Sequence, residues 1–419
     1  MCKMLIALIL LFSVGAAKAF SICPAWISPS RTRTPAERRA APAVGVAAFA
    51  FGLPRNSHHV RKPTSLVAST LQRTGDATDE THDEGGGGHY GDDCEVLLLD
   101  HLNINHEKGR HDIVKAFYFD FLGLAVDPRK YENIAAGSKT LWANVGLHQF
   151  HLPEGKPDAQ VFDGTITLVY GDLDTLIQRY NDFVDDVEPR FRPLKDTEFS
   201  LGVLDSDMMM VTCPWGSQFI LLRSHEPDED RAAHLGSQPL VDGHEPSEGL
   251  KMEDLTVFVE NDSNLEGIGR FYEKVLGAVV VPDLSSESSI SIAMGQSQTL
   301  TFQHHPDGSE KKVVHHDFSD AGDENYPANY GPHISLYVTN LPKAYQAAGE
   351  LGVLYVNPRF KRRAYTEDEA IDQCMFRIID IVDPLDEDRT VICRLEHEVR
   401  SAKTRDGKKY KSFPLKSVT

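Results

Sequence analysis

Apolar residues recur at helical spacing at two places in the chain, each time just before a glycine. At the second place, positions i, i+3, i+4, i+7 and i+8 are Ile268, Phe271, Tyr272, Val275 and Leu276. Such a stripe predicts an amphipathic helix, and Gly277 suits its C-terminal cap. The sequence Phe-Tyr-x3-Leu-Gly-x2-Val-x-Pro is shared by 117–128 and 271–282. This internal repeat predicts a related helix that ends at Leu122.

Strand-like runs precede and follow these helices. Residues 99–105 and 255–259 come before them, and a second repeated piece, at 163–173 and 331–341, reads as a strand that leads into a further helix. Asn340 and Pro342 fit the N-cap and first position of the last helix. Strand-like runs follow at 207–223 and 375–396. The pattern predicts an α+β protein of four strand–helix–strands units, which begin near residues 96, 163, 252 and 332.

The four units predict two consecutive modules, 95–226 and 250–399. The segment between them, 227–249, contains Pro, Gly, Asp and His and is typical of a linker. A longer polar stretch, 306–331, separates the third unit from the fourth. The basic residues 400–419 are expected to form a solvated tail.

The first residues are typical of a targeting sequence. Residues 4–17 are an apolar run, too short to span a bilayer of about 30 Å as a helix, and Ala17-Lys18-Ala19 suits signal-peptide cleavage. Residues 20–75 are rich in Arg, Ser, Ala and Pro, as transit peptides are. A signal peptide (1–19) followed by a transit peptide resembles the bipartite plastid presequence of algae with secondary plastids. A membrane anchor and a secreted protein with a basic pro-segment are the alternatives.

Charge supports this division of the chain. The formal net charge is −19, yet residues 1–75 carry ten Lys/Arg and one acid, or +9, which leaves −28 for the rest. The acidic, Gly-rich residues 76–94 read as a flexible linker. An acidic mature chain argues against nucleic acid as a partner, and six cysteines in 419 residues make no disulfide framework. We therefore expect a plastid protein with no membrane span after processing.

Four βαβββ units, the Phe-Tyr-x3-Leu-Gly helix ends and the Cys-Pro-Trp-Gly-Ser turn at 213–217 together resemble the vicinal oxygen chelate superfamily, over about residues 94–399. This superfamily includes glyoxalase I and the extradiol dioxygenases. The resemblance implies that paired units form a cup for a divalent metal, with ligands from the first and last strands of each unit. The resemblance also implies a small-molecule substrate and is compatible with a homodimer.

The resemblance places candidate ligands by position. Strand alternation puts His101, Asn103 and Asn105 on one face. In the first unit the ligand positions hold His101 and His151, and in the fourth they hold His333 and Glu396. The second unit offers Thr165 and Ile220, which are poor ligands, and the third offers Leu255 and His304. His304 also belongs to a His-rich group with His305, His315 and His316. We expect this polar stretch to form a solvated loop.

Two pairings of the units are open. If units pair within each module, the second module holds His304, His333 and Glu396. If the first unit pairs with the fourth and the second with the third, one site gathers His101, His151, His333 and Glu396, and the other has none but His304. The exchanged pairing requires that His101 and His333 lie within about 10 Å, because His–metal bonds are near 2.1 Å.

The implied chemistry is metal-assisted. Imidazoles with one carboxylate suit Zn, Ni, Fe or Mn, and the metal would polarise a small carbonyl, enediol or catechol-like substrate. Glu396 would shuttle the proton in a lyase or isomerase, or would complete a 2-His-1-carboxylate dioxygenase site with His101 and His333. Asn103, Tyr337 and Arg394 share the alternation of the ligands and are expected to face the cavity. A non-catalytic binding protein and a plastid pseudoenzyme are the alternatives.

Overall fold

The computed structural model describes residue 90 and residues 92–130, 140–155, 159–225, 245–295, 298–306, 332–357 and 360–414. They all belong to one compact unit that runs from Glu80 to Thr419. The predicted signal and transit peptides, and His315 and His316, lie outside the described residues.

The first two units follow the predicted order of strand, helix and three strands. The first consists of β1 (Val96–Asn103), α2 (His111–Val114), η1 (Lys115–Phe121), β2 (Ala125–Val126), η2 (Pro128–Lys130), β3 (Thr140–Val145) and β4 (His148–Pro153). The second consists of β5 (Gly164–Tyr170), α4 (Asp174–Val184), η3 (Pro189–Leu194), β6 (Ser200–Val203), β7 (Met208–Thr212) and β8 (Gln218–Arg223).

The third and fourth units have the same order. The third consists of β9 (Gly249–Val259), α6 (Leu265–Leu276), η4 (Pro282–Leu284), β10 (Ser289–Ala293) and β11 (Thr299–His304). A single bridge between Val280 and Ile292 stands where the other units have their second strand. The fourth consists of β12 (His333–Val338), α7 (Leu341–Leu351), β13 (Leu354–Tyr355), α8 (Glu367–Gln373), β14 (Met375–Val382) and β15 (Val391–Ser401). The α+β class is therefore confirmed.

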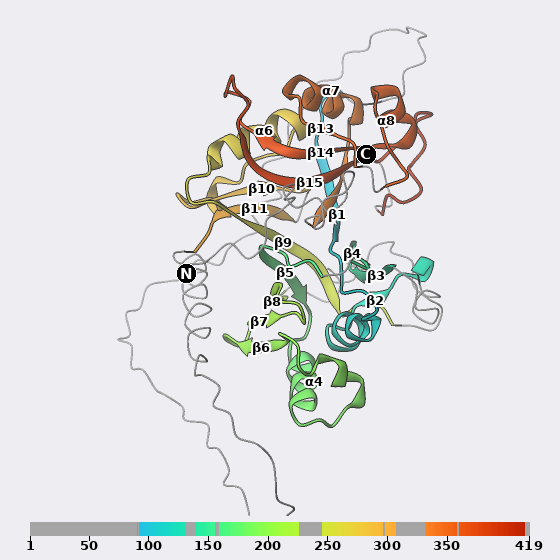
Figure 1. Ribbon diagram of the computed structural model, residues 1–419, viewed down its shortest axis with the longest axis vertical. Helices are drawn as coiled ribbons and strands as arrows, with labels where there is room; N and C mark the ends of the chain where they lie inside the picture. The colour runs from blue at the N-terminus through green and yellow to red at the C-terminus, as the bar shows by residue number, and fades with distance from the viewer. Residues whose placement is uncertain are drawn as a thin grey trace, which may run out of the picture. The chain divides into compact units, whose positions relative to one another are not determined.

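The units pair in the exchanged way. One sheet has the order β13-β14-β15-β12-β1-β4-β3-β2, and the other β10-β11-β9-β5-β8-β7-β6. The central contacts are antiparallel: β1 pairs with β12, and β5 with β9. In Figure 1 the blue strand β1 lies among the orange and red strands of the fourth unit. Each sheet thus takes one unit from each of the consecutive segments 95–226 and 250–399.

Buried apolar side chains of both sheets and their helices form one continuous core. Polar contacts also join the sheets: the Met252 amide donates to Nδ1 of His148 at 3.0 Å, and the Gln298 side chain bonds the backbone of Leu99. Since these contacts are buried, breaking them would leave unpaired polar groups, which favours a fixed relation between the two sheets.

The helices α6 and α7 end and begin as the sequence predicts. Gly277 caps α6 in the left-handed region, with φ of 62°, and the Asn340 side chain accepts from the amide of Lys343 at the start of α7. The helix of the first unit differs from the regular helix expected there. After one α turn it continues as a π-helix, in which the Leu122 amide bonds the Phe117 carbonyl. The wider turns bury Phe117 and Phe121 together against Phe199.

The C-terminal residues differ from the expected solvated tail. The strand β15 continues to Ser401, and beyond it Tyr410 and Phe413 are buried with their rings beside Tyr337. These two aromatic rings among the lysines supply enough apolar surface to hold the segment on the sheet. Among the described residues, no helix is both long and apolar enough to cross a bilayer.

Candidate active site

The exchanged pairing brings the predicted histidines of the first and fourth units together. The ring centroids of His101 and His333 lie 5.9 Å apart, and those of His101 and His151 lie 3.7 Å apart in a stack. Trp142 extends the stack, since its ring is 4.1 Å from that of His151. Three imidazoles from β1, β4 and β12 therefore line one cavity of about 330 Å³.

A backbone irregularity adds a carboxylate to this group. Strand alternation alone would turn Asp100 away from the face of His101. The register of β1 against β12 shifts between Leu99 and His101, however, and both Asp100 and His101 line the cavity. Such a bulge re-aims a side chain. Oδ2 of Asp100 lies 2.8 Å from Nδ1 of His101, so the carboxylate accepts the Nδ1 proton and leaves Nε2 with its lone pair.

The carboxylates of the last strand are held by arginine. Glu396 lies beside His333 in the register of β12 and β15, as predicted, but its Oε1 accepts from Nη1 of Arg377 at 2.6 Å. Asn357 Nδ2 donates to both oxygens of Glu396, at 3.0 and 2.9 Å. Glu398, two residues on, bonds both Arg377 and Arg400. Of the two glutamates, Glu398 lines the cavity.

The other predicted residues divide between the cavity and its surroundings. Asn103 lines the cavity. Tyr337 shares the cavity face of the sheet but is covered by the C-terminal residues, and its hydroxyl accepts from Arg400 at 3.4 Å. His304 lies in the other sheet, where its Nε2 is 3.1 Å from the Ser263 carbonyl.

Arg394 does not line the cavity as expected. It has the alternation of Glu396 and Glu398, but it lies in the first part of β15, which is largely exposed. Its side chain is 42% exposed and donates to Asp380 at 2.8 Å. Alternation identified the correct face of the strand but not how far along it the cavity extends.

Burial sets the charge state of the histidines. It lowers the pKa of His101, against the effect of Asp100, and it lowers the pKa of His151 and His333 well below the usual value, with further contributions from His101 and Arg377 respectively. All three imidazoles are therefore neutral near pH 7. Burial would raise the pKa of Glu398, but Arg400 and Arg377 hold it well below its usual range, whereas burial raises that of Glu396.

The cavity is rich in positive charge although the chain is acidic. Five cationic side chains are among its lining residues, against two carboxylates, Asp100 and Glu398; the cations are Arg129, Lys361, Arg362, Arg377 and Arg400. The carboxylates of Asp127 and Glu396 lie behind this lining and pair with Arg129 and Arg377. The five cations exceed these four carboxylates by one, and a small positive excess of this kind favours a small anion.

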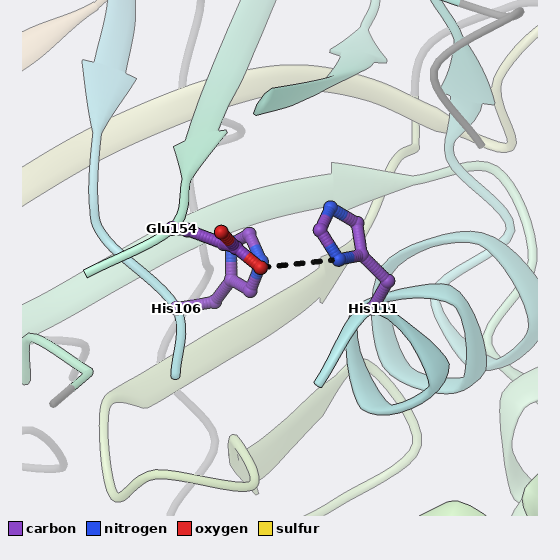
Figure 2. Close-up of side chains that lie close together, drawn as sticks. All are labelled: His106, His111 and Glu154. Carbon is purple, nitrogen blue, oxygen red and sulfur yellow. Dashed lines mark ion pairs between the residues drawn. The ribbon is translucent and has the colours of Figure 1, made fainter. Parts of the chain in front are cut away.

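The three imidazoles do not fit a common metal ion as they are arranged. The rings of His101 and His151 are stacked, the two nearby glutamates bond guanidinium groups, and among the described residues the ligand atoms of the three imidazoles do not gather closely enough to hold one ion. In the described part of the chain, the donor atoms that do converge belong to His106, His111 and Glu154, none of which lines the cavity (Figure 2).

Sequence reasoning missed several residues of the cavity. Glu398 could have been found, because it shares the alternation of Glu396 on the same strand. Asp100 needed the bulge, and Asn357, which bonds Glu396 behind the cavity lining, needed a loop whose path the sequence does not give. Arg129 and Arg377 carry no pattern that separates them from surface arginines. Each of the four enters the site through tertiary contacts.

Comparisons with known proteins found similar solved structures and no match by sequence. No family model and no curated protein matched the sequence. Among solved structures, the chain is similar to a glyoxalase I mutant from Zea mays, at 13% identity and a TM-score of 0.39, over 74% of this chain and 93% of that one. A putative dioxygenase from Bacillus subtilis subsp. subtilis str. 168 is similar at 11% identity and a TM-score of 0.40, over 73% and 86%.

A third similar structure is 2,2',3-trihydroxybiphenyl 1,2-dioxygenase from Sphingomonas wittichii strain RW1, at 14% identity and a TM-score of 0.24, over 75% of this chain and 93% of that one. The fold assignment rests on the four units and their strand order. The paired units have the architecture that the sequence resemblance to the vicinal oxygen chelate superfamily predicted. This fold hosts several chemistries, so the activity must be argued from the cavity itself.

Proposed function

We propose that the protein binds a small anionic carbonyl or enediol compound in the cavity between its first and fourth units and removes a proton next to the carbonyl. The observation that carries this proposal is His101, which has Asp100 at its Nδ1 and a pKa lowered by burial, in a cavity that four arginines line. A neutral imidazole oriented by a carboxylate is a suitable general base.

In this reaction His101 Nε2 takes the proton from the carbon α to the carbonyl, and the electron pair of the broken C–H bond passes to the carbonyl oxygen. Arginines of the cavity stabilise the resulting enolate, because they already stand in a buried site and need no reorganisation. Arg377 bonds Glu396 and Glu398 and lines the cavity together with Arg129, Arg362 and Arg400.

The proposal keeps the small oxygenated substrate predicted from the sequence. The metal-dependent lyase and dioxygenase versions need an ion among His101, His151 and His333, whose nitrogens do not converge, so no step is assigned to a metal there. A binding protein without catalysis is the second candidate. It is favoured by the carboxylates of Glu396 and Glu398, which are held by arginine rather than turned to a substrate.

The two candidates are separated by deuterium exchange. The purified protein is incubated in D2O with pyruvate, 2-oxobutyrate or dihydroxyacetone phosphate, and NMR follows the loss of the protons α to the carbonyl. We expect exchange above the buffer rate for at least one compound, and a loss of about 10²-fold or more in His101→Gln. His304→Gln, a half-buried histidine of the other sheet, is the matched control and should exchange as the wild type does.

Binding of these anions without exchange would support the binding protein. Failure to bind any anion, measured by calorimetry at low ionic strength, would rule out both candidates. The plastid location is also part of the proposal, because the predicted presequence implies it.

A further inference from the structure

A second group of potential ligands lies outside the cavity, at the end of β1 and β4. His106 follows β1, Glu154 follows β4, and His111 is the first residue of α2. The ligand atoms of the three side chains all lie within 4.8 Å of one another. Figure 2 shows the three side chains turned toward one another, with Nδ1 of His111 at 3.8 Å from Oε1 of Glu154.

The histidines of this group have ring nitrogens without hydrogen bonds. His106 is 1% exposed, and within the described part of the chain neither of its ring nitrogens has a hydrogen-bond partner. Nε2 of His111 is also buried and has none. Burying a polar group without a partner costs about 1–3 kcal/mol. One ion takes a single nitrogen from each imidazole, and both rings have a nitrogen that the described part of the chain leaves without a hydrogen bond, which indicates a ligand that the protein chain does not supply.

The backbone holds the donors in place without that ligand. The amide of His106 donates to the Pro153 carbonyl at 2.9 Å, and the amide of Gly155 donates back to the His106 carbonyl at 2.7 Å, so His106 and Glu154 are neighbours in a short parallel bridge. The amide of Gly109 donates to Oε1 of Glu154 at 2.9 Å. The rings of His106 and His111 meet edge to face, with centroids 4.8 Å apart.

We propose that His106, His111 and Glu154 bind a divalent transition-metal ion. Two imidazoles and one carboxylate are the donor set of catalytic zinc and of non-haem iron sites, and they leave coordination positions open. Bonds of about 2.1 Å at the tetrahedral angle place donor atoms about 3.4 Å apart, so ligand atoms that lie within 4.8 Å of one another need to close by up to about 1.4 Å. Zinc is the probe of choice because it has no geometric preference of its own.

An ion can reach this site from solvent. The side chains of His111 and Glu154 are 14% and 15% exposed, whereas His106 forms the inner wall with the Trp215 ring 6.3 Å away. The open coordination positions would therefore face the exposed side and take water. This metal site is independent of the general-base chemistry proposed for the cavity, and either can fail without the other.

Zinc binding by the purified, metal-stripped protein tests the proposal. Calorimetry should find one tight equivalent of Zn²⁺ that is weakened at least 100-fold in Glu154→Gln and in His111→Ala. The control variants His101→Ala and His304→Ala should keep it. With Co²⁺ in place of Zn²⁺, the visible absorption of a nitrogen- and oxygen-bound ion should appear in the wild type and disappear in Glu154→Gln.

The melting temperature separates a lost site from a lost fold. Without metal, Glu154→Gln should melt near the wild type, and zinc should raise the melting temperature of the wild type but not of the variant. The proposal is overturned if zinc binding is equal in the wild type and both variants, or if His101→Ala removes the tight equivalent. Should Glu154→Gln not fold, His111→Ala, which changes a partly exposed side chain, decides the question.

Discussion

Arg377 lies with its Nη1 2.6 Å from Oε1 of Glu396, and both side chains are almost fully buried. The same guanidinium also bonds Glu398. Removing Arg377 would leave the buried carboxylate of Glu396 without its arginine and Glu398 with Arg400 alone. We expect Arg377→Gln to lower the free energy of unfolding by about 3–5 kcal/mol at pH 7, as loss of one member of a buried ion pair does.

Chemical denaturation of the variant measures this loss. The matched control is Arg394→Gln on the same sheet, because the Arg394–Asp380 pair is exposed to solvent. Exposed pairs contribute about 0–1 kcal/mol, so the control should differ little from the wild type. Equal losses in the two variants would mean that the buried network does not stabilise the fold.

Buried histidines make the fold sensitive to acid. Burial lowers the pKa of His397 to about 4, and its Nε2 lies 2.6 Å from the Tyr272 hydroxyl. The unfolded chain takes up the proton near pH 6.5, before the folded protein does. The contribution of neutral His397 to the free energy of unfolding is therefore complete above about pH 6.5, and it is lost as the pH falls toward 4.

We expect the drop in the free energy of unfolding between pH 7.5 and pH 4.5 to be about 2.5 kcal/mol smaller in His397→Gln than in the wild type, at about 1.4 kcal/mol per pH unit per group. The comparison cancels the titration of the glutamates and of the cavity histidines, which both proteins share. An identical drop in both would show that His397 takes up its proton in the folded state.

Gly277 and Gly352 both cap helices in the left-handed region, but we expect Gly→Ala to lower the free energy of unfolding by different amounts at the two positions. A Cβ at Gly277 would lie 1.7 Å from the Cys94 carbonyl oxygen, whereas at Gly352 the nearest atom is 3.6 Å away. Gly352→Ala should cost about 1–2 kcal/mol, the strain of the left-handed conformation. Gly277→Ala should cost clearly more, because backbone must also move. Denaturation of the two variants measures the difference, and equal costs would contradict the predicted clash.

The presequence predicts two steps of targeting. A fluorescent protein fused after residues 1–75 should enter the plastid of an alga with a secondary plastid. The same fusion with residues 20–75 alone should remain outside, because it lacks the signal peptide. Secretion of the longer fusion would favour the alternative of a basic pro-segment.

The sequence by itself determined the order of the four units and the caps of two helices, Gly277 at the end of α6 and Asn340 at the start of α7. Apolar spacing and the glycine after Leu276 depend on neighbours within one or two turns, so Gly277 and Asn340 could be placed without knowing the fold. Strand alternation likewise identified the face that carries His101 and His333. These are local rules, and they hold wherever the element lies.

Tertiary structure decided which units pair, and with them the site. Pairing β1 with β12 brings His101 and His333 together, and no local pattern prefers it to pairing within each segment. The bulge at Asp100, the arginine that holds Glu396 and the meeting of His106 with Glu154 all depend on contacts between strands far apart in the chain. The role of such residues depends on their neighbours in space, which local sequence does not give. The reason is that the free energy of a buried charge or an unpaired imidazole depends on the groups that surround it.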